Sequence, residues 1–207
     1  MRIIAGTHRG RRLVGPPDDR VTRPITDMVK ESVFNILRGH VEGHTVVDAF
    51  AGSGSMGLEA ASRGAESVLC VEQNRQIAGL LRENIEMLGE GDRCRVLQSD
   101  ALGAAALAQC PEPVHVVFFD PPYQLMTDPV RRERVLEQLG RFIEKLDDEG
   151  YALLRTPSPL RNDGSSRVGV GSSDLSLRIP GALGPETHEY GSMAVHLYMR
   201  DSGASGE

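Results

Sequence analysis

The tetrapeptide Asp120-Pro121-Pro122-Tyr123 combines residue types that can hold a nucleic acid base. It directly follows an apolar run at residues 114–119, which is short, rich in β-branched and aromatic residues, and typical of a buried strand. Two prolines cannot continue a strand, so a rigid turn should follow. There a carboxylate and an exposed backbone carbonyl would accept the two hydrogen bonds of an exocyclic amine, and an aromatic ring would stack on the base.

A glycine-rich turn precedes this motif and follows a candidate strand at residues 45–50. Gly52, Gly54 and Gly57 have the GxGxxG spacing, in which glycines let the backbone approach a cofactor before a helix begins. This spacing, even with a carboxylate at the end of the next strand, fits a methyl donor and a dinucleotide about equally. Asp48 favours the methyl donor, because its carboxylate would attract an amino-acid-like ammonium and disfavour a pyrophosphate.

Two further carboxylates follow candidate strands at residues 67–72 and 95–98. Glu72 ends the first strand, where a carboxylate typically accepts hydrogen bonds from both ribose hydroxyls. Asp100 follows the second, where it would accept from an adenine amine or, alternatively, cap the following helix. Both residues, like Asp120, come at the carboxyl end of a strand, which is where open α/β sheets bind ligands.

Strand and helix patterns alternate from residue 45 onward, which predicts a mainly parallel α/β sheet. Besides the strands above, we expect a strand at 151–156, a final strand at 193–199 that forms an antiparallel edge hairpin, and helices at 55–63, 74–88, 101–109 and 130–146. Thr26 should cap an amphipathic helix that ends before Gly39. The Gly-, Pro- and Ser-rich stretch 157–185 should be a long loop around one short strand at 175–179.

The amino-terminal segment is basic. Residues 1–23 hold six arginines and two aspartates, a net charge of +4, which leaves −10 for the rest of a chain whose total is −6. Short strand candidates at 2–5 and 12–14 predict a small β-hairpin with arginines on its exposed side. Such an arm suits phosphate binding, although a solvated arginine-rich terminus would look the same. We expect an arm at residues 1–24 and a main domain at 25–207.

The composition fits an ordinary globular protein. The chain has 207 residues, of which 40% are hydrophobic and 25% are charged. Its three cysteines include no CxxC pair, which argues against a disulfide framework or a zinc site and favours a reducing cytoplasm. No segment approaches the roughly 20 apolar residues of a membrane span, so we expect neither export nor membrane insertion.

Several motifs occur together in an order that suggests a family. They are Arg-Ile-Ile-Ala-Gly at 2–6, Gly-Arg-Arg-Leu at 10–13, Arg-Pro-Ile-Thr-Asp at 23–27, Asp-Ala-Phe-Ala-Gly-Ser-Gly at 48–54, the tetrapeptide at 120–123 and Glu-Tyr-Gly at 189–191. With them the chain resembles class I S-adenosylmethionine-dependent methyltransferases that methylate amino groups of nucleic acids. More narrowly, it resembles the bacterial family that methylates the exocyclic N2 of a guanine in 16S ribosomal RNA.

The resemblance implies a Rossmann-like fold, S-adenosylmethionine as cofactor, and a role for each motif residue. The catalytic residues would be Asp120, Pro121, Pro122 and Tyr123, which hold and stack the guanine so that its amine meets the sulfonium methyl in line. The cofactor-binding residues would be Asp48, Phe50, Gly52, Gly54, Glu72, Gln73, Asp100, Ala101 and Thr26. The RNA-binding residues would be Arg9, Arg11, Arg12 and Arg23. No metal ion is expected, because a sulfonium is already a good leaving group.

The resemblance also implies ribosomal RNA as partner, and the acidic body suggests an assembling 30S subunit rather than naked RNA. We expect a monomer in the cytoplasm. One alternative is an amino-methyltransferase acting on adenine N6 or cytosine N4, although such DNA enzymes often need a separate recognition region for which this chain has no room. Another is a non-catalytic RNA-binding assembly factor, which the intact cofactor loop and Asp120 argue against. A dinucleotide oxidoreductase fits least, since nothing resembles a hydride-transfer site.

Overall fold

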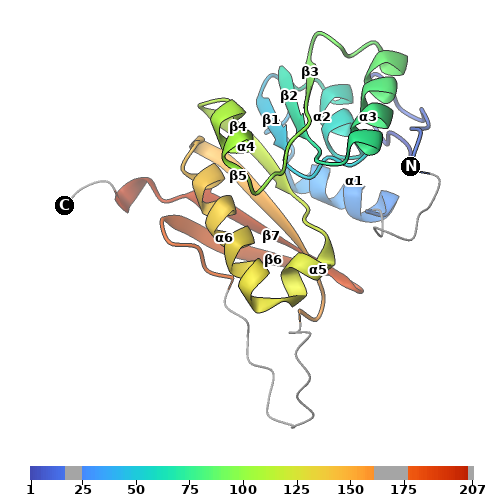
Figure 1. Cartoon of the computed structure of the whole chain (residues 1–207). Helices are drawn as coiled ribbons and strands as arrows, with labels where there is room; N and C mark the ends of the chain where they lie inside the picture. Colours follow the sequence, from blue (N-terminus) through green and yellow to red (C-terminus); the bar gives the residue numbers. More distant parts are fainter. Residues whose placement is uncertain (17–24, 161–176, 205–207) are drawn as a thin grey trace.

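The computed structural model describes residues 1–16, 25–160 and 177–204 and is built around one mixed sheet (Figure 1). Seven strands follow the order β3-β2-β1-β4-β5-β7-β6. They are β1 (Thr45–Asp48), β2 (Ser67–Val71), β3 (Cys94–Leu97), β4 (Val114–Phe119), β5 (Leu146–Pro157), β6 (Ala182–Tyr190) and β7 (Met193–Arg200). The strands from β3 to β5 are parallel, and β7 is antiparallel to both β5 and β6. The predicted mainly parallel sheet with antiparallel C-terminal strands is confirmed.

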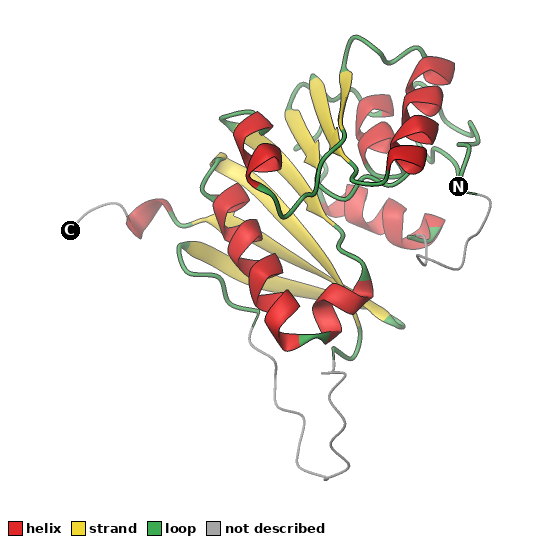
Figure 2. Ribbon diagram, in the orientation of Figure 1, coloured by secondary structure: helices red, strands yellow, loops and turns green. Residues whose placement is uncertain are grey.

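Helices cover both faces of the sheet (Figure 2). They are α1 (Asp27–Ile36), α2 (Gly57–Ser62), α3 (Arg75–Leu88), α4 (Ala104–Gln109), α5 (Tyr123–Thr127), α6 (Pro129–Ile143) and the short 3-10 helix η1 (Ser202–Ala204). The first three pack into one hydrophobic cluster with alternate residues of the strands, such as Val116. Helices α4 to α6 pack into the other cluster with the intervening residues, such as Val117. The sheet therefore has buried residues on both faces, as the continuous apolar run of β4 requires.

Local signals in the sequence explain where the helices start and stop. Thr26 caps α1, as predicted, by accepting a hydrogen bond from the Val29 N–H at 3.4 Å. Asn74 caps α3 in the same way, and Gly89 ends that helix with φ +71°, a left-handed conformation that favours glycine. Within the described residues, no helix is long and apolar enough to cross a membrane.

The predicted amino-terminal hairpin is not built from two regular strands. Arg2 and Arg12 make a single antiparallel bridge. Beside this bridge, the Ile3 N–H donates to the carbonyl oxygen of Arg11 at 2.9 Å, whereas the Ile4 and Ala5 N–H groups bind the buried carboxylate of Glu59 on α2 at 2.7 and 3.0 Å. The segment thus folds back on itself but is fastened to α2.

Besides the short η1, two elements in the structure were not predicted from the sequence. Helix α5 begins directly after the prolines, where only a turn was expected. Strand β6 contains Gly184 and Pro185, and its pairing with β7 shifts register between Leu183 and Glu186, which hides the alternating pattern of a strand. Strand β6 is therefore an edge strand of the sheet, and β7 lies between β5 and β6.

Other predicted bounds were also wrong, including those of the strand expected at 151–156, which begins at Leu146. The helix expected at 130–146 ends at Ile143, because Leu146 already pairs with Val114 as the start of β5. The helix expected at 101–109 begins only at Ala104. Of the strand expected at 175–179, residues 177–179 are not in a strand and the others lie outside the described residues.

Candidate active site

The carboxyl ends of β1 to β4 meet at one edge of the sheet, and each is followed or closed by an acidic residue. Asp48 closes β1, Glu72 follows β2, Asp100 follows β3 and Asp120 follows β4. Because these strands are parallel neighbours, all four residues lie along the same edge. Open α/β sheets bind ligands at the carboxyl ends of their strands, and we call this row of strand ends the ligand edge.

Asp48 lies beneath the glycine-rich turn. Its side chain is buried, and Oδ2 accepts a hydrogen bond from the Gly57 N–H at 2.8 Å. Burial raises the pKa of Asp48 to about 7; the Gly57 hydrogen bond opposes this effect, whereas the negative charges of Asp120 and Glu72 add to it. The carboxylate therefore ties the start of α2 to the end of β1.

The glycines of the turn serve different purposes. A Cβ on Gly54, whose φ is +99°, would lie 2.6 Å from carbon atoms of Leu58 and Leu81. A Cβ on Gly57 would lie 2.8 Å from the sulfur of Cys70. Gly52 has φ +55° and a Cβ there would meet no atom within 4 Å. Packing thus requires glycine at the two later positions, whereas Gly52 borders open space.

Glu72 connects the turn to the start of α3. Its Oε2 accepts from the Gly52 N–H at 3.0 Å, and its Oε1 accepts from the Asn74 N–H at 2.7 Å. Gln73, between them, is exposed. Both oxygens of Glu72 thus bind backbone N–H groups and fix the position of this carboxylate beside the open space at Gly52.

The residues after β3 form a separate turn. Asp100 is exposed, and its Oδ1 accepts from the Leu102 N–H at 2.9 Å. Since α4 begins at Ala104 with Gly103 as its N-cap, Asp100 does not cap that helix. Ala101 is buried. The alternative considered for Asp100, a helix cap, is wrong, and its side chain closes an exposed turn at the ligand edge.

Two other predicted cofactor residues lie on different sides of the sheet. Phe50 is half-buried and packs edge-on against Phe119, with ring centres 5.0 Å apart. Thr26 is exposed at the start of α1, where its hydroxyl oxygen serves as the helix cap. Phe50 follows β1 and lies at the ligand edge. Thr26 contributes to the site only by capping α1 and so helping to fix the position of that helix.

Asp120 forms an ion pair with Arg155, a residue that was not predicted from the sequence to belong to the site. Arg155 Nε donates to Asp120 Oδ1 at 2.5 Å, and the two side chains are 10% and 22% exposed, respectively. Parallel pairing of Phe119 with Leu154 brings the next residues, Asp120 and Arg155, side by side. Burial raises the pKa of Asp120, and the charge and hydrogen bond of Arg155 oppose that effect.

The remaining residues of the tetrapeptide lead from the strand into α5. Pro121 is buried, Pro122 is the N-cap of α5, and Tyr123 is its first residue. The guanidinium carbon of Arg155 lies 5.4 Å from the centre of the Tyr123 ring, within the range of a cation–π contact. Asp120 and Arg155 line a cavity of about 20 Å³, which has room for about one water molecule.

The predicted RNA-binding arginines lie on the amino-terminal segment. Arg9, Arg11 and Arg12 are exposed, and Arg23 lies outside the described residues. Asn84 of α3 joins this segment to the glycine-rich turn, because its Nδ2 donates to the carbonyl oxygens of Val14 and Ser53, both at 2.9 Å. The segment and the candidate cofactor turn are thus held against the same helix.

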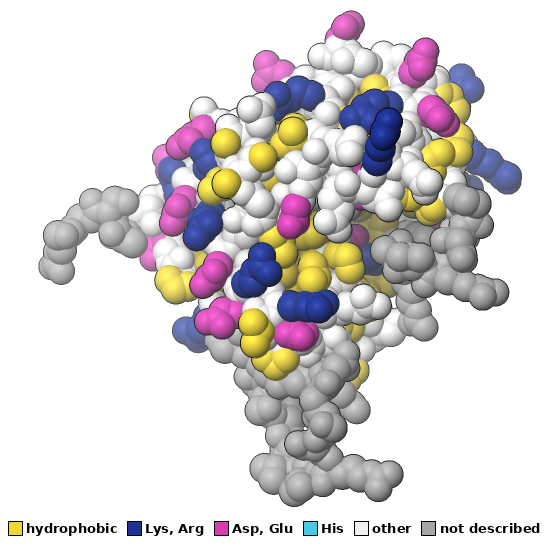
Figure 3. Space-filling model, viewed as in Figure 1, with side chains coloured by type: hydrophobic (Ala, Val, Ile, Leu, Met, Phe, Trp, Pro, Cys, Tyr) yellow, Lys and Arg dark blue, Asp and Glu magenta, His cyan; other side chains and the backbone are white. Residues whose placement is uncertain are grey.

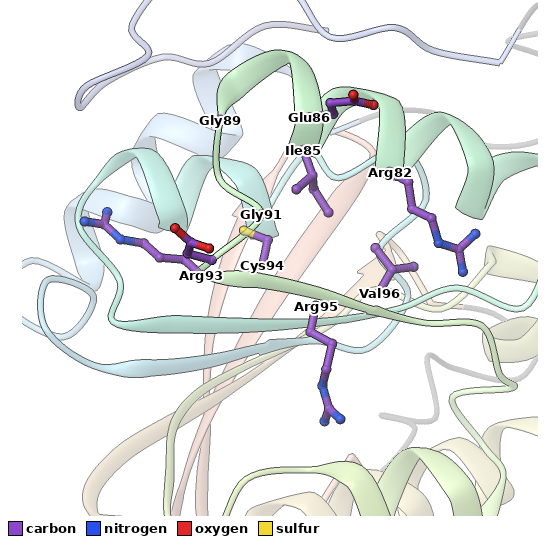
Figure 4. A pocket seen from close by; sticks show the side chains of 10 residues that line it. Arg82, Ile85, Glu86, Gly89, Gly91, Arg93, Cys94, Arg95 and Val96 are labelled. Atoms are coloured by element: carbon purple, nitrogen blue, oxygen red, sulfur yellow. The ribbon is translucent and has the colours of Figure 1, made fainter.

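A larger cavity lies elsewhere. It measures about 750 Å³, is open to solvent, and lies between α3 and β3. Its three arginines, Arg82, Arg93 and Arg95, point in different directions (Figure 4). Basic and acidic side chains are also interspersed on the face seen in Figure 3. None of the predicted site residues lines this cavity, so its size does not mark the active site.

Comparison with known proteins places most of the chain in one family. Residues 1–150 match the family model described as conserved hypothetical protein 95. Ribosomal RNA small subunit methyltransferase D of Escherichia coli is 37% identical over 166 residues, which cover 78% of this chain and 76% of that protein. YlbH of Bacillus subtilis, described as a proposed rRNA methyltransferase, is 34% identical over 155 residues, which cover 73% of this chain and 79% of that protein.

A solved structure gives the same assignment for the fold. The proposed methyltransferase yhhF of Escherichia coli superposes with a TM-score of 0.74 and 29% sequence identity, and the match covers 98% of both chains. The sheet described above is therefore the Rossmann-like sheet of methyltransferases.

Proposed function

The chain belongs to the conserved hypothetical protein 95 family, and from this premise, together with its likeness to small-subunit ribosomal RNA methyltransferases, we propose that it methylates the exocyclic N2 amine of a guanine in 16S ribosomal RNA. One observation carries the choice of site. Asp120, an acceptor carboxylate, stands at the ligand edge of the sheet, on the strand next to Asp48 and the glycine-rich turn. A base held at Asp120 would therefore lie next to the glycine-rich turn, where the family resemblance places the methyl donor.

The residues around the turn suit S-adenosylmethionine. Gly52 borders open space, and the buried hydroxyl of Ser53 has no hydrogen-bond partner within the described part of the chain. Glu72 presents a carboxylate fixed next to Gly52. We assign Gly52, Ser53 and Asp48 to the methionine end of the cofactor and Glu72 to its ribose. When bound, S-adenosylmethionine supplies an electrophilic methyl group on a positively charged sulfur.

Asp120 acts on the nucleophile. With S-adenosylmethionine held by the residues assigned above, the methyl carbon would pass to the guanine nitrogen and the electrons of its carbon–sulfur bond would stay on sulfur. Positive charge grows on the nitrogen during this step, and the Asp120 carboxylate stabilises it electrostatically. The nitrogen then loses one proton, for which this carboxylate is the nearest acceptor. Positioning supplies the rest of the rate, and the backbone carbonyl of Pro121 and the ring of Tyr123 orient the base.

The amino-terminal segment serves substrate binding in this proposal. Exposed Arg9, Arg11 and Arg12 contact RNA phosphates, and Arg23 acts with them. Residues 1–24 form the RNA-contacting arm and residues 25–207 the methyltransferase domain. Because the body of the chain is acidic, the substrate is an assembling 30S subunit, in which ribosomal proteins also offer binding surfaces. The enzyme acts as a monomer in the cytoplasm.

The proposal is tested by methylating small subunits purified from a strain that lacks its own enzyme for this guanine. Radiolabelled S-adenosylmethionine and nucleoside analysis by mass spectrometry should give N2-methylguanosine. Label in N6-methyladenosine or N4-methylcytidine would instead support the alternative amino-methyltransferase. An absence of label, with cofactor binding intact, would support the non-catalytic assembly factor.

A further inference from the structure

Arg155 lies where the substrate base has to bind. It touches both groups assigned to base recognition, because its Nε donates to Asp120 Oδ1 at 2.5 Å and its guanidinium carbon lies 5.4 Å from the centre of the Tyr123 ring. A bound base would use the same carboxylate as acceptor and the same ring as stacking partner. A base that used the same carboxylate oxygen and the same face of the ring would displace Arg155.

The space beside this pair is too small for a base as well. The cavity lined by Asp120 and Arg155 measures about 20 Å³ and is otherwise apolar, with Met56, Phe118 and Leu153 among its lining residues. Such a volume holds about one water molecule. A base bound in this cavity would therefore have to displace the Arg155 guanidinium.

The group in place has the same chemistry as part of guanine. Atoms N1, C2 and N2 of guanine form a planar guanidine unit whose N1–H and N2–H donors point the same way, as do two N–H donors of an arginine side chain. Adenine and cytosine instead carry an acceptor ring nitrogen next to their amine, which would face the carboxylate with its lone pair. A carboxylate that accepts from a guanidine is thus better matched to guanine than to either alternative base.

We propose that Arg155 occupies the base subsite as an internal stand-in for guanine and is displaced by the guanidine edge of the target base. This inference rests on the proposed function and identifies a residue that controls access to the same site. The ion pair keeps the Asp120 charge balanced while the site is empty, and an incoming base has to replace both the hydrogen bond and the ring contact. Arg155 thereby competes with the substrate and disfavours bases that lack the guanidine edge.

The first test is the kinetics of Arg155→Ala with small subunits as substrate at pH 8. A hydrogen bond between charged groups typically contributes about 1.5–3 kcal/mol, so removing Arg155 as a competitor should lower the KM for the subunit about tenfold. The change in kcat should be smaller than this change in KM. Arg155→Lys, which keeps the charge but loses the planar group, should give an intermediate KM. Arg200→Ala is the matched control, because Arg200 pairs with Asp148 in an exposed ion pair away from the site.

The second test restores the missing group from solution. Guanidinium ion at about 10 mM, far below denaturing concentrations, should compete with the subunit in Arg155→Ala and raise its KM. Equal sodium chloride should have no such effect, and neither the wild-type protein nor Arg200→Ala should respond to guanidinium beyond the salt control. A merely structural role for Arg155 would produce no selective competition.

The outcomes separate this inference from the function on which it rests. If the wild-type protein transfers no methyl group to the small subunit, the proposed function is wrong. If it does transfer, and both Arg155 variants show an unchanged or higher KM without selective guanidinium inhibition, the stand-in role is wrong and the function stands. Arg155→Lys provides this test even if the alanine variant does not fold.

Discussion

Replacing Asp120 with asparagine separates the charge of this residue from its shape. Asparagine keeps the size and one acceptor oxygen but cannot balance the positive charge that grows on the attacking nitrogen. Preorganised groups that stabilise such charge typically contribute 10²–10³ in kcat, about 2.7–4 kcal/mol. Because the Asp120 side chain is 22% exposed, water screens part of its field, and we expect the lower end, a loss of about 100-fold.

The same substitution leaves Arg155 with an unbalanced charge. Breaking a fully buried ion pair costs about 3–5 kcal/mol, whereas exposed pairs contribute about 1 kcal/mol or less. For side chains that are 10% and 22% exposed, we expect a loss of about 2 kcal/mol in the free energy of unfolding. A domain of ordinary stability, about 5–15 kcal/mol, stays folded under this loss. A fall in kcat therefore reports chemistry rather than unfolding.

The assay is single-turnover methyl transfer at saturating small subunit, with cofactor affinity measured by calorimetry and stability by urea unfolding. Asp128→Asn is the control, since Asp128 caps α6 by accepting from the Arg131 N–H at 3.0 Å and asparagine caps equally well. That variant should retain kcat. A kcat within threefold of wild type in Asp120→Asn, or a loss of cofactor affinity that matches the loss of rate, would refute the assigned role.

Three further substitutions test the cofactor turn and the RNA arm. Gly54→Ala should lower the free energy of unfolding by about 2–4 kcal/mol in urea titrations, because its Cβ would lie 2.6 Å from Leu58 in a left-handed backbone. Gly52→Ala should lower it by only about 1 kcal/mol but should weaken S-adenosylmethionine binding in calorimetry. Burial raises the pKa of Asp48 from 3.8 to about 7, so the folded state holds a proton that the unfolded state has lost and stability falls between about pH 4 and 7. Asp48→Asn should remove this dependence and, at pH 8, exceed the wild-type free energy of unfolding by up to about 4 kcal/mol; a variant less stable than wild type at pH 8 would contradict the pKa. The double change Arg9→Ala and Arg11→Ala should weaken RNA binding and reduce the slope of log affinity against log salt by about 1–2, as measured by filter binding, and an unchanged slope would place RNA elsewhere.

The sequence predicts the sheet well because β4 is apolar except for His115 and because strand and helix patterns alternate along the chain. Asp48, Glu72 and Asp120 could be placed on one edge by that logic alone, since parallel strands share their carboxyl ends. The boundaries of α3 were also predictable, because Asn74 and Gly89 are strong local signals for a helix start and stop.

The parts that could not be predicted depend on long-range contacts. The amino-terminal segment has the alternation of two strands, but its pairing stays short, and the Ile4 and Ala5 N–H groups bind Glu59, more than 50 residues away. Strand β6 follows a stretch of glycine, serine and proline and carries a register shift that conceals its period. Arg155 is the one cation of β5, and only the pairing of β4 with β5 shows that it reaches Asp120.

Asp48 and Asp120 show how the surroundings give two neighbouring carboxylates different tasks. Asp48, on β1, is buried against a backbone N–H, and burial raises its pKa to about 7, which suits a residue that shapes the turn. Asp120, on the adjacent strand, has Arg155 to oppose the effect of burial. In the proposed exchange, the neutral guanine replaces Arg155, so the positive charge that opposes the effect of burial on the pKa of Asp120 is removed. Asp120 thus becomes the stronger proton acceptor at the step in which the methylated nitrogen has to lose its proton.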